Sequence, residues 1–265
     1  MRIIVLKFGG ASLKDLSHLE RAADIIVRKK IEFSRIIVIV SAMGKTTDDL
    51  LNLAKSVSDA PPLREQDMLI SVGERISMSL LAIALSKRGV LARSFTGSQA
   101  GIITTEEHCD AKILDVRPKR LIPYLDRGDI LIIAGFQGVS LSGEITTLGR
   151  GGSDTSAVAL AVSLKAEKVE FYKDVKGIFS SDPKKNLDAT LYRTLEYKEV
   201  LELIKDERVK VLHPRAIKLA EKNDIPLHVL TFHIDERSLG TLVLKGGNQL
   251  RTGPIYEKIE DVVEC

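Results

Sequence analysis

Short runs of β-branched and other apolar residues alternate along this chain with longer stretches of helical periodicity. The strand-like runs are IIVL, RIIVIV, DILIIAG, KVEFY and IPLHVL. The helical stretches include HLERAADIIVRKK, SVGERISMSLLAIALSKRG and DTSAVALAVSLKAEK. Continuous apolar strands that alternate with helices are typical of a parallel sheet covered on both faces. The sequence therefore predicts an α/β fold, a three-layer αβα sandwich around an open, mostly parallel central sheet.

The chain is expected to form a single domain over residues 1–265. No repeat, low-complexity segment or proline-rich linker divides it, so any two lobes share one continuous sheet. The turn-rich segment GFQGVSLSG, residues 135–143, interrupts the alternating pattern. We therefore expect the boundary there, between an N-terminal lobe of about residues 1–138 and a C-terminal lobe of about residues 139–265.

Composition excludes several classes of function. The 39 lysines and arginines nearly balance the 36 aspartates and glutamates, and they form no basic face for nucleic acid. The two cysteines and five histidines are scattered, without the spacing of a metal site. No apolar run approaches the roughly 18 residues of a membrane helix, and no signal-peptide pattern opens the chain. We expect a soluble, cytoplasmic protein with no dedicated metal site and no membrane or nucleic-acid partner.

The loop TTLGRGGSD, residues 146–154, places an arginine and a carboxylate among glycines at the start of an apolar helical stretch. Backbone N–H groups of Gly151, Gly152 and Ser153 are predicted to point outward from the helix N-terminus, where anions are favoured. Arg150 could grip a carboxylate with two hydrogen bonds, and Asp154 could orient phosphate-binding ammonium groups. An Asp at this position is often only a partner of the helix dipole, but an arginine flanked by glycines favours a binding function.

A second glycine-rich turn, KFGGAS at residues 7–12, follows the first strand-like run. Lys7 at a strand end, beside Gly9, Gly10 and Ser12, lets backbone and ammonium approach a phosphate together. A tight strand-to-helix turn with a surface lysine is an equally good interpretation of this segment alone. Two such loops in one chain suggest that two anionic groups are held facing each other.

Two further segments offer polar groups after strand-like runs. In SAMGKTTDDLL, residues 41–51, capping of the next helix by Thr47 or Asp48 is the favoured interpretation. In YKDVKGIFSSDPKK, residues 172–185, an aromatic ring, an Asp and a Gly could wrap a purine and its ribose, while Lys184 or Lys185 could reach phosphates. Asp182 followed by proline predicts a turn.

Several familiar nucleotide-site and catalytic motifs are absent from the sequence. It has no GxxxxGK[ST] loop, no GxGxxG fingerprint, no protein-kinase HRD and DFG pair and no GxSxG elbow. Any phosphoryl transfer must therefore use a different phosphate cradle, and the paired glycine-rich loops supply one.

Seven motifs, in the same order along the chain, resemble those of the aspartate kinases of the amino-acid kinase superfamily. They are KFGGAS, SAMGKTTD, SVGERIS, GFQG, TTLGRGGSDTSA, YKDVKGIFSSDP and KVLHPRA, and together they span nearly the whole sequence. The resemblance implies ATP-dependent phosphorylation of the aspartate side-chain carboxylate to 4-phospho-L-aspartate, the entry to lysine, threonine and methionine synthesis. It places the amino-acid substrate on the N-terminal lobe and the nucleotide on the C-terminal lobe.

The resemblance also implies roles for individual residues. Lys7, Asp154 and Lys210 are similar in position to the catalytic residues, the two lysines stabilising the transferring phosphoryl group and Asp154 holding them. Arg150 resembles the group that grips the substrate α-carboxylate, and Glu74 the acceptor of its α-ammonium group, in a site lined by Ser41, Thr47 and Phe136. The expected nucleotide-binding residues are Tyr172, Lys173, Asp174, Gly177, Ile178, Asp182 and Lys184.

Charge stabilisation is the main demand of this reaction, because a carboxylate is already a nucleophile and two anions must be brought together. Lysines, helix N-termini and Mg²⁺ meet that demand. The lack of a metal cage suits Mg²⁺ held largely by the phosphates of ATP.

The chain departs from the family pattern at several positions. Ala11 stands where KFGGTS is usual, Lys173 where Thr or Ser is usual, Lys184 where Arg is usual, and Arg208-Val209 where Gly-Ala is usual. The chain ends too soon for the paired ACT domains of the family, which predicts insensitivity to end products or regulation by a separate subunit. A homodimer is expected from the resemblance alone.

Two alternative functions remain open from the sequence. The same core could phosphorylate another amino acid, such as homoserine at its hydroxyl, although that acceptor needs a base to take its proton. A non-catalytic amino-acid-binding regulatory subunit is disfavoured, because Lys7, Asp154 and Lys210 are all retained.

Overall fold

A mostly parallel sheet forms the centre of the molecule. The computed structural model describes residues 2–183, 185–206, 211–233, 239–246 and 254–257. Within these residues, eight strands pair in the spatial order β10-β12-β11-β9-β1-β2-β6-β3. All neighbours are parallel except β11 and β12. The strands are β1 (Ile3–Phe8), β2 (Arg35–Val40), β3 (Ala92–Phe95), β6 (Ile130–Ala134), β9 (Val169–Lys173), β10 (Thr194–Glu196), β11 (Leu227–Thr231) and β12 (Thr241–Leu244).

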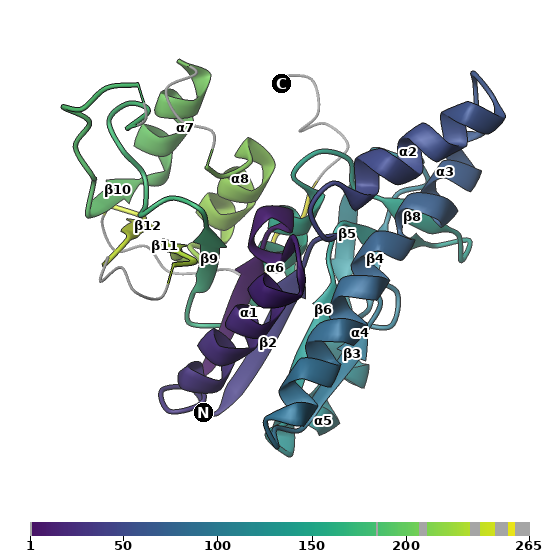
Figure 1. The fold of residues 1–265 in the computed structure, drawn as a ribbon, viewed down its shortest axis with the longest axis horizontal. Helices are drawn as coiled ribbons and strands as arrows, with labels where there is room; N and C mark the ends of the chain where they lie inside the picture. Colours follow the sequence, from purple (N-terminus) through teal and green to yellow (C-terminus); the bar gives the residue numbers. More distant parts are fainter. Residues whose placement is uncertain (1, 184, 207–210, 234–238, 247–253, 258–265) are drawn as a thin grey trace.

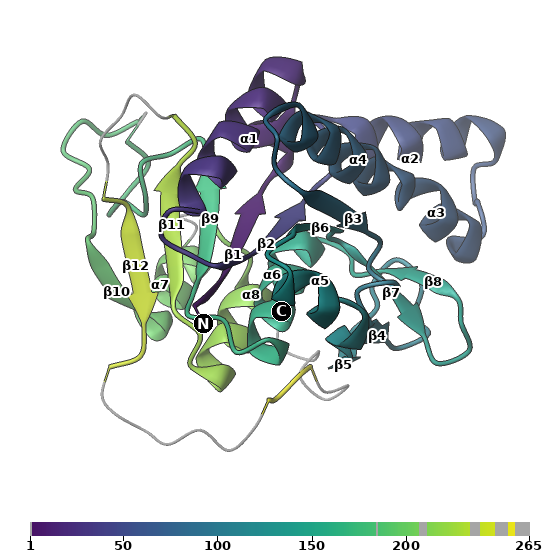
Figure 2. The ribbon, with the colours of Figure 1, turned by 90° about the horizontal axis from the view of Figure 1, so that it is seen from below.

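Helices cover both faces of this sheet (Figure 1). Figure 2 shows α1 and α4 on one face and α6 and α8 on the other. The helices are α1 (Leu16–Lys29), α2 (Thr46–Val57), α3 (Leu63–Ile70), α4 (Val72–Lys87), α5 (Ile122–Asp126), α6 (Gly152–Ser163), α7 (Tyr197–Lys205) and α8 (Pro214–Asn223), with 3-10 turns at Gly10–Leu13 and Pro118–Arg120. The prediction of a three-layer α/β fold is confirmed.

Alternation of side chains along β1 determines which residues face each helical layer. Ile4, Leu6 and Phe8 belong to the apolar cluster beneath α1 and α4, whereas Val5 belongs to the cluster beneath α6. Successive side chains of a strand point to opposite faces, so Lys7 at the end of β1 shares the face of Val5. This parity directs the ammonium group of Lys7 toward the N-terminus of α6.

The same parity holds in β9, the neighbour of β1. Val169 and Phe171 lie in the α6 cluster, and Tyr172 lies in the α1 cluster. Lys173, two positions after Phe171, therefore lies on the α6 side. The Tyr172 hydroxyl donates to a Glu170 carboxylate oxygen on its own side of the sheet at 2.8 Å.

A smaller sheet, which the sequence patterns did not reveal, lies beside the larger one. It has the order β5-β4-β7-β8 within the described residues. Its strands are β4 (Ile102–Thr104), β5 (Ile113–Val116), β7 (Gln137–Ser140) and β8 (Ile145–Thr147). Strands of three or four residues give too little alternation to predict from the sequence. The loop after β8, residues 148–151, contains Arg150 between glycines and leads directly into α6. The smaller sheet therefore positions this glycine–arginine loop.

One helical stretch has the length and composition of a membrane span, contrary to the expectation from the sequence. Leu63–Lys87, which includes α3 and α4, contains an 18-residue window with mean hydropathy 1.6. Half of that window is buried inside the protein, and α4 packs against α1, β3 and β6. Packing in the core therefore accounts for the buried half of this apolar window.

Candidate functional site

Two neighbouring cavities open at the carboxyl edge of the central strands. The first has a volume of about 930 Å³ and the second about 630 Å³. Lys7 and Gly10 line both cavities. A group bound in one cavity can therefore meet a group bound in the other at the Lys7 ammonium.

The first cavity brings together most of the residues predicted to bind the amino acid or to act on it. Those that line it are Lys7, Gly10, Ser41, Thr47, Glu74, Phe136, Arg150, Gly151, Gly152, Ser153 and Asp154. They come from the ends of β1 and β2, from the 3-10 turn after β1, from α2, α4 and the first turn of α6, and from the loops before β7 and after β8. Residues from both sides of the expected lobe boundary thus form its walls.

A buried ion pair lies between the cavities. The Lys7 Nζ atom is 2.5 Å from Asp154 Oδ1, and both side chains are less than one-tenth exposed. The Lys173 Nζ atom is 3.3 Å from the other carboxylate oxygen, Oδ2. One carboxylate in the first turn of α6 thus holds two ammonium groups, one from β1 and one from β9.

The two charges stabilise each other against the cost of burial. Burial lowers the pKa of Lys7 to about 8, although the Asp154 carboxylate opposes this shift and the Lys173 ammonium adds to it. Burial alone would raise the pKa of Asp154, but Lys173 and Lys7 outweigh it and lower that pKa to about 2. Asp154 is therefore an anion at neutral pH and a poor proton acceptor.

Glu74 on α4 is a second buried carboxylate in the first cavity. Its Oε1 atom accepts a hydrogen bond from the Ala42 N–H at 2.9 Å. Its Oε2 atom is buried without a hydrogen-bond partner among the described residues. Burial raises the pKa of Glu74 to about 7, despite the opposing backbone hydrogen bond. An unpartnered carboxylate oxygen in a cavity is well suited to accept an ammonium group from a ligand.

The glycine–arginine loop adopts a conformation that requires glycine. Gly149 and Gly151 have φ values of +67° and +72°, and a Cβ atom on Gly151 would lie 2.0 Å from the His213 ring. Gly151 is the N-cap of α6. The Gly152 N–H, predicted to face an anion, instead donates to the Gly149 carbonyl at 3.0 Å. Arg150 between these glycines is exposed on the cavity wall.

The predicted capping of α2 by Thr47 or Asp48 is wrong. The N-cap of α2 is Lys45, which makes no side-chain capping hydrogen bond. The N-cap thus lies two residues before Thr47, and the Thr46 hydroxyl donates to the Met43 carbonyl at 2.7 Å. Thr47 and Asp48 instead line the first cavity.

The second cavity gathers the glycine-rich turn at residues 7–12 and much of the segment predicted to bind the nucleotide. The predicted residues that line it are Lys7, Gly9, Gly10, Ser12, Lys173, Asp174, Gly177 and Asp182. The predicted turn at Asp182 is confirmed by a hydrogen bond from the Lys185 N–H to its carbonyl at 3.0 Å. Lys184 and Lys210 lie outside the described residues.

Two predicted nucleotide-binding residues line neither cavity. The Tyr172 ring stacks on Phe8 with centroids 4.8 Å apart, on the α1 side of the sheet. Ile178 is fully buried in the core, and its N–H donates to the Thr241 hydroxyl at 2.8 Å. Neither residue lines the second cavity, and a role for either at the nucleotide stays a prediction.

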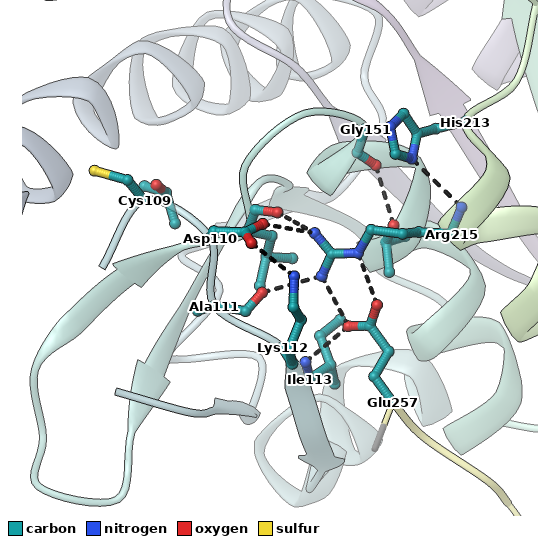
Figure 3. A network of polar contacts seen from close by, with 12 residues as sticks. Cys109, Asp110, Ala111, Lys112, Ile113, Gly151, His213, Arg215 and Glu257 are labelled. Carbon is teal, nitrogen blue, oxygen red and sulfur yellow. Dashed lines mark hydrogen bonds and ion pairs between the residues drawn. The ribbon is translucent and has the colours of Figure 1, made fainter. Parts of the chain in front are cut away.

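The sequence analysis missed an arginine network at the rim of the first cavity, shown in Figure 3. Arg215 Nε donates to Glu257 Oε1 at 2.8 Å, and its Nη2 donates to Glu257 Oε2 and the Ala111 carbonyl, both at 3.0 Å. Its Nη1 donates to the Leu148 carbonyl. Glu257 Oε2 also accepts from the Ile113 N–H at 2.9 Å. The KVLHPRA motif contained Arg215, but no sequence signal pointed to Glu257.

We expect Arg215→Met to lower the free energy of unfolding by about 3 kcal/mol, because it leaves the Glu257 carboxylate unpaired in a site only 12% exposed. Urea denaturation measures this loss. Arg28→Met, at an exposed position on α1, is the matched control and should change stability by less than about 0.5 kcal/mol. Equal stability of the Arg215 variant and the wild type would contradict the network's role.

Comparison with known proteins matches this geometry to a family. The model of the amino acid kinase family matches residues 2–231. The aspartokinase of Mycolicibacterium smegmatis is 50% identical over 244 residues, which are 92% of this chain and 57% of that protein. The aspartokinase of Geobacillus stearothermophilus is 48% identical over 243 residues, 92% of this chain and 59% of that protein. The chain thus spans less than two thirds of the length of these relatives.

Solved structures agree with the family match. The aspartate kinase from Synechocystis has a TM-score of 0.82 and 43% identity, covering 94% of this chain and 41% of that chain. E. coli aspartokinase III in complex with aspartate and ADP has a TM-score of 0.80 and 28% identity, covering 93% and 65%. The UMP kinase from Bacillus anthracis, with a TM-score of 0.64 and 21% identity, covers 92% and 96% and shares the fold. With the family model matched across most of its length, the chain belongs to the amino acid kinase family.

Proposed function

We propose that this chain transfers the γ-phosphoryl group of ATP to the side-chain carboxylate of L-aspartate, giving 4-phospho-L-aspartate. The observation that carries the proposal is the meeting of two cavities at the Lys7–Asp154 ion pair. The aspartokinase names of the relatives and the aspartate and ADP bound to the E. coli enzyme support the choice of substrates.

In this proposal the first cavity binds the amino acid. Glu74 accepts the α-ammonium group and Arg150 binds the α-carboxylate, because opposite charges on one cavity wall match the two charges of an α-amino acid. Ser41, Thr47 and Phe136 complete the walls. The side-chain carboxylate then points toward Lys7.

The second cavity holds the nucleotide in this proposal. The phosphates lie along the loop of Gly9, Gly10 and Ser12, and the ribose and base lie along Asp174 and Gly177. This turn packs tightly against the loop after β2, because a Cβ atom on Gly10 would lie 2.9 Å from the Ala42 carbonyl oxygen. The catalytic role of Lys210 and the nucleotide-binding role of Lys184 remain predictions.

The reaction proceeds by attack of a substrate carboxylate oxygen on the γ-phosphorus, and ADP leaves with the bridging oxygen. Lys7 stabilises the charge that spreads over the phosphoryl oxygens, and Asp154 holds Lys7 in place. No proton has to be removed from a carboxylate. A hydroxyl acceptor such as homoserine would need a base, and Asp154 with a pKa of about 2 is a poor one.

We also propose that the nucleotide brings Mg²⁺. The described residues contain no group of three or more metal-ligating side chains, which suits an ion held mainly by phosphate oxygens and water. Asp174 and Asp182 are the carboxylates that line the second cavity and would add ligands. The ion neutralises phosphate charge when it is bound. A cytoplasmic location, a homodimer and a separate regulatory subunit remain predictions.

Purified protein with Mg²⁺ and ATP should form an acyl phosphate only when L-aspartate is present. Hydroxylamine traps the acyl phosphate as a hydroxamate, and a panel with homoserine, glutamate and acetylated amino acids tests the acceptor. ADP release with homoserine but without hydroxamate would contradict the proposal and move the acceptor from a carboxylate to a hydroxyl.

We expect Arg150→Met to raise the KM for aspartate about 30-fold with little change in the KM for ATP, because a charged hydrogen bond contributes about 2 kcal/mol. Steady-state kinetics with each substrate varied in turn measures this. The control is Arg120→Met, at an exposed position. A rise confined to the KM for ATP would place Arg150 at the nucleotide instead.

A further inference from the structure

Lys173 stands beside Asp154 as the second of two ammonium groups on one carboxylate. Its Nζ atom lies 3.3 Å from Asp154 Oδ2, while Lys7 occupies the Oδ1 side at 2.5 Å. Lys173 is the last residue of β9 and Lys7 is near the end of β1, and these two strands are parallel neighbours. The alternation of side chains described above directs both groups toward α6.

The two lysines differ in the cavities that they line. Lys7 borders both cavities, whereas Lys173 borders only the second, together with Gly9, Gly10 and Ser12 of the glycine-rich turn. Lys173 therefore lies on the phosphate side of Asp154. Its side chain is 18% exposed, so the ammonium group can reach a ligand there without leaving the carboxylate.

The ion pairs at Asp154 are uneven in charge. Two ammonium groups share one carboxylate, and the two lysines repel each other. Glu74 also faces Lys7, but from the first cavity, where it is suited to a ligand ammonium group. Among the described residues, Asp154 is the one carboxylate that pairs with Lys173. A poorly solvated positive charge of this kind is stabilised when an anion binds.

We propose that Lys173 is a further catalytic residue, which contacts the terminal phosphate of ATP and shares with Lys7 the charge of the transferring phosphoryl group. This inference rests on the proposed function. The bond from the substrate carboxylate oxygen to the γ-phosphorus forms as the bond to the β-phosphate oxygen breaks. Lys173 keeps its proton throughout and acts by its charge alone. Asp154 aligns both ammonium groups, one on each of its oxygens.

A contact with the terminal phosphate has a consequence for binding that a purely structural lysine lacks. ATP carries a γ-phosphate and ADP does not, so loss of Lys173 should weaken the binding of a non-hydrolysable ATP analogue more than the binding of ADP. A lysine that only holds Asp154 in place would affect both nucleotides equally.

The test compares Lys173→Met, Lys173→Arg and the wild type by calorimetric titration with ADP and with the analogue, each with Mg²⁺, and by steady-state kinetics with aspartate. For Lys173→Met we expect the affinity for the analogue to fall at least tenfold relative to that for ADP. Turnover should fall about 100-fold or more, with the KM for aspartate within threefold of the wild-type value. Lys173→Arg, which keeps the charge, should recover part of both losses.

Lys165→Met, at an exposed position beyond the far end of α6, is the matched control. It should leave both the turnover and the ratio of the two nucleotide affinities unchanged. Equal losses for ADP and the analogue, or turnover within threefold of the wild type, would overturn the proposal. If Lys173→Met does not fold, Lys173→Gln takes its place in the same titrations. If the wild type phosphorylates no amino acid, the proposed function fails, while the nucleotide titrations still decide the contact with the terminal phosphate.

Discussion

Asp154→Asn should reduce turnover about 1000-fold or more while leaving ADP bound at least as tightly as in the wild type. The carboxylate holds Lys7 and Lys173 on its two oxygens, and asparagine offers no charge to align them during phosphoryl transfer. Removing the anion also leaves two ammonium groups without their partner, which favours the binding of a polyphosphate such as ADP. Turnover with aspartate and calorimetric titration with ADP measure the two effects.

Asp59→Asn, at an exposed position after α2, serves as the control for this variant. The Asp154 variant should also unfold at a lower temperature, because the two lysines lose a buried partner. Its activity is therefore measured well below its unfolding midpoint. Turnover within tenfold of the wild type in the folded variant would show that Asp154 does not organise the site.

Glu74→Gln should weaken aspartate binding and, at the same time, stabilise the free protein at alkaline pH. Burial raises the pKa of Glu74 to about 7 from its usual 4.5. The folded protein therefore binds this proton more tightly than the unfolded chain does. Below about pH 4.5 both states are protonated, and as the pH rises through 7 the folded state loses stability.

The size of this loss follows from the pKa difference, at about 1.4 kcal/mol for each unit. It approaches about 3 kcal/mol above pH 8, and glutamine, which does not ionise, avoids it. We expect urea denaturation to show the Glu74→Gln variant more stable than the wild type at pH 8 and equally stable at pH 4.5. The KM for aspartate should rise about 30-fold, since an ionised hydrogen bond to the substrate ammonium is lost.

Glu106→Gln, at an exposed position, is the control and should change neither quantity. A Glu74→Gln variant that is less stable than the wild type at every pH would mean that the carboxylate is a structural anchor for Ala42. An unchanged KM for aspartate would remove Glu74 from the amino-acid site.

The elements that could be predicted from the sequence are those buried on both faces. The runs at residues 36–40 and 130–134 are apolar throughout and form adjacent parallel strands. The apolar stretch from residue 152 forms α6, which is buried along nearly its whole length. Such segments are stable only where all their faces are covered, as in the central sheet or in a buried helix. The short strands of the smaller sheet depend on tertiary contacts and left no such pattern.

The candidate site was predictable where a motif places its own residues, and less so where the fold brings distant residues together. Glycines on either side of Arg150 indicated the loop before α6, and this loop lines the first cavity. Arg215 and Glu257 lie 42 positions apart and meet only in the folded chain. Tyr172 matched a motif, yet strand parity turns its ring to the opposite side of the sheet from Lys173. The division into a substrate lobe and a nucleotide lobe stays a prediction.

The alternation along β1 makes this strand intolerant of insertions and deletions. One extra residue within it would exchange the two faces of every position that follows. With an insertion before Leu6, the Leu6 side chain would occupy the place between the cavities, and the Lys7 ammonium would lie among the apolar side chains beneath α1. A single such change would remove the Lys7 ammonium from the site and disrupt the core at the same time. We therefore expect the length of this strand to tolerate less variation than its individual residues.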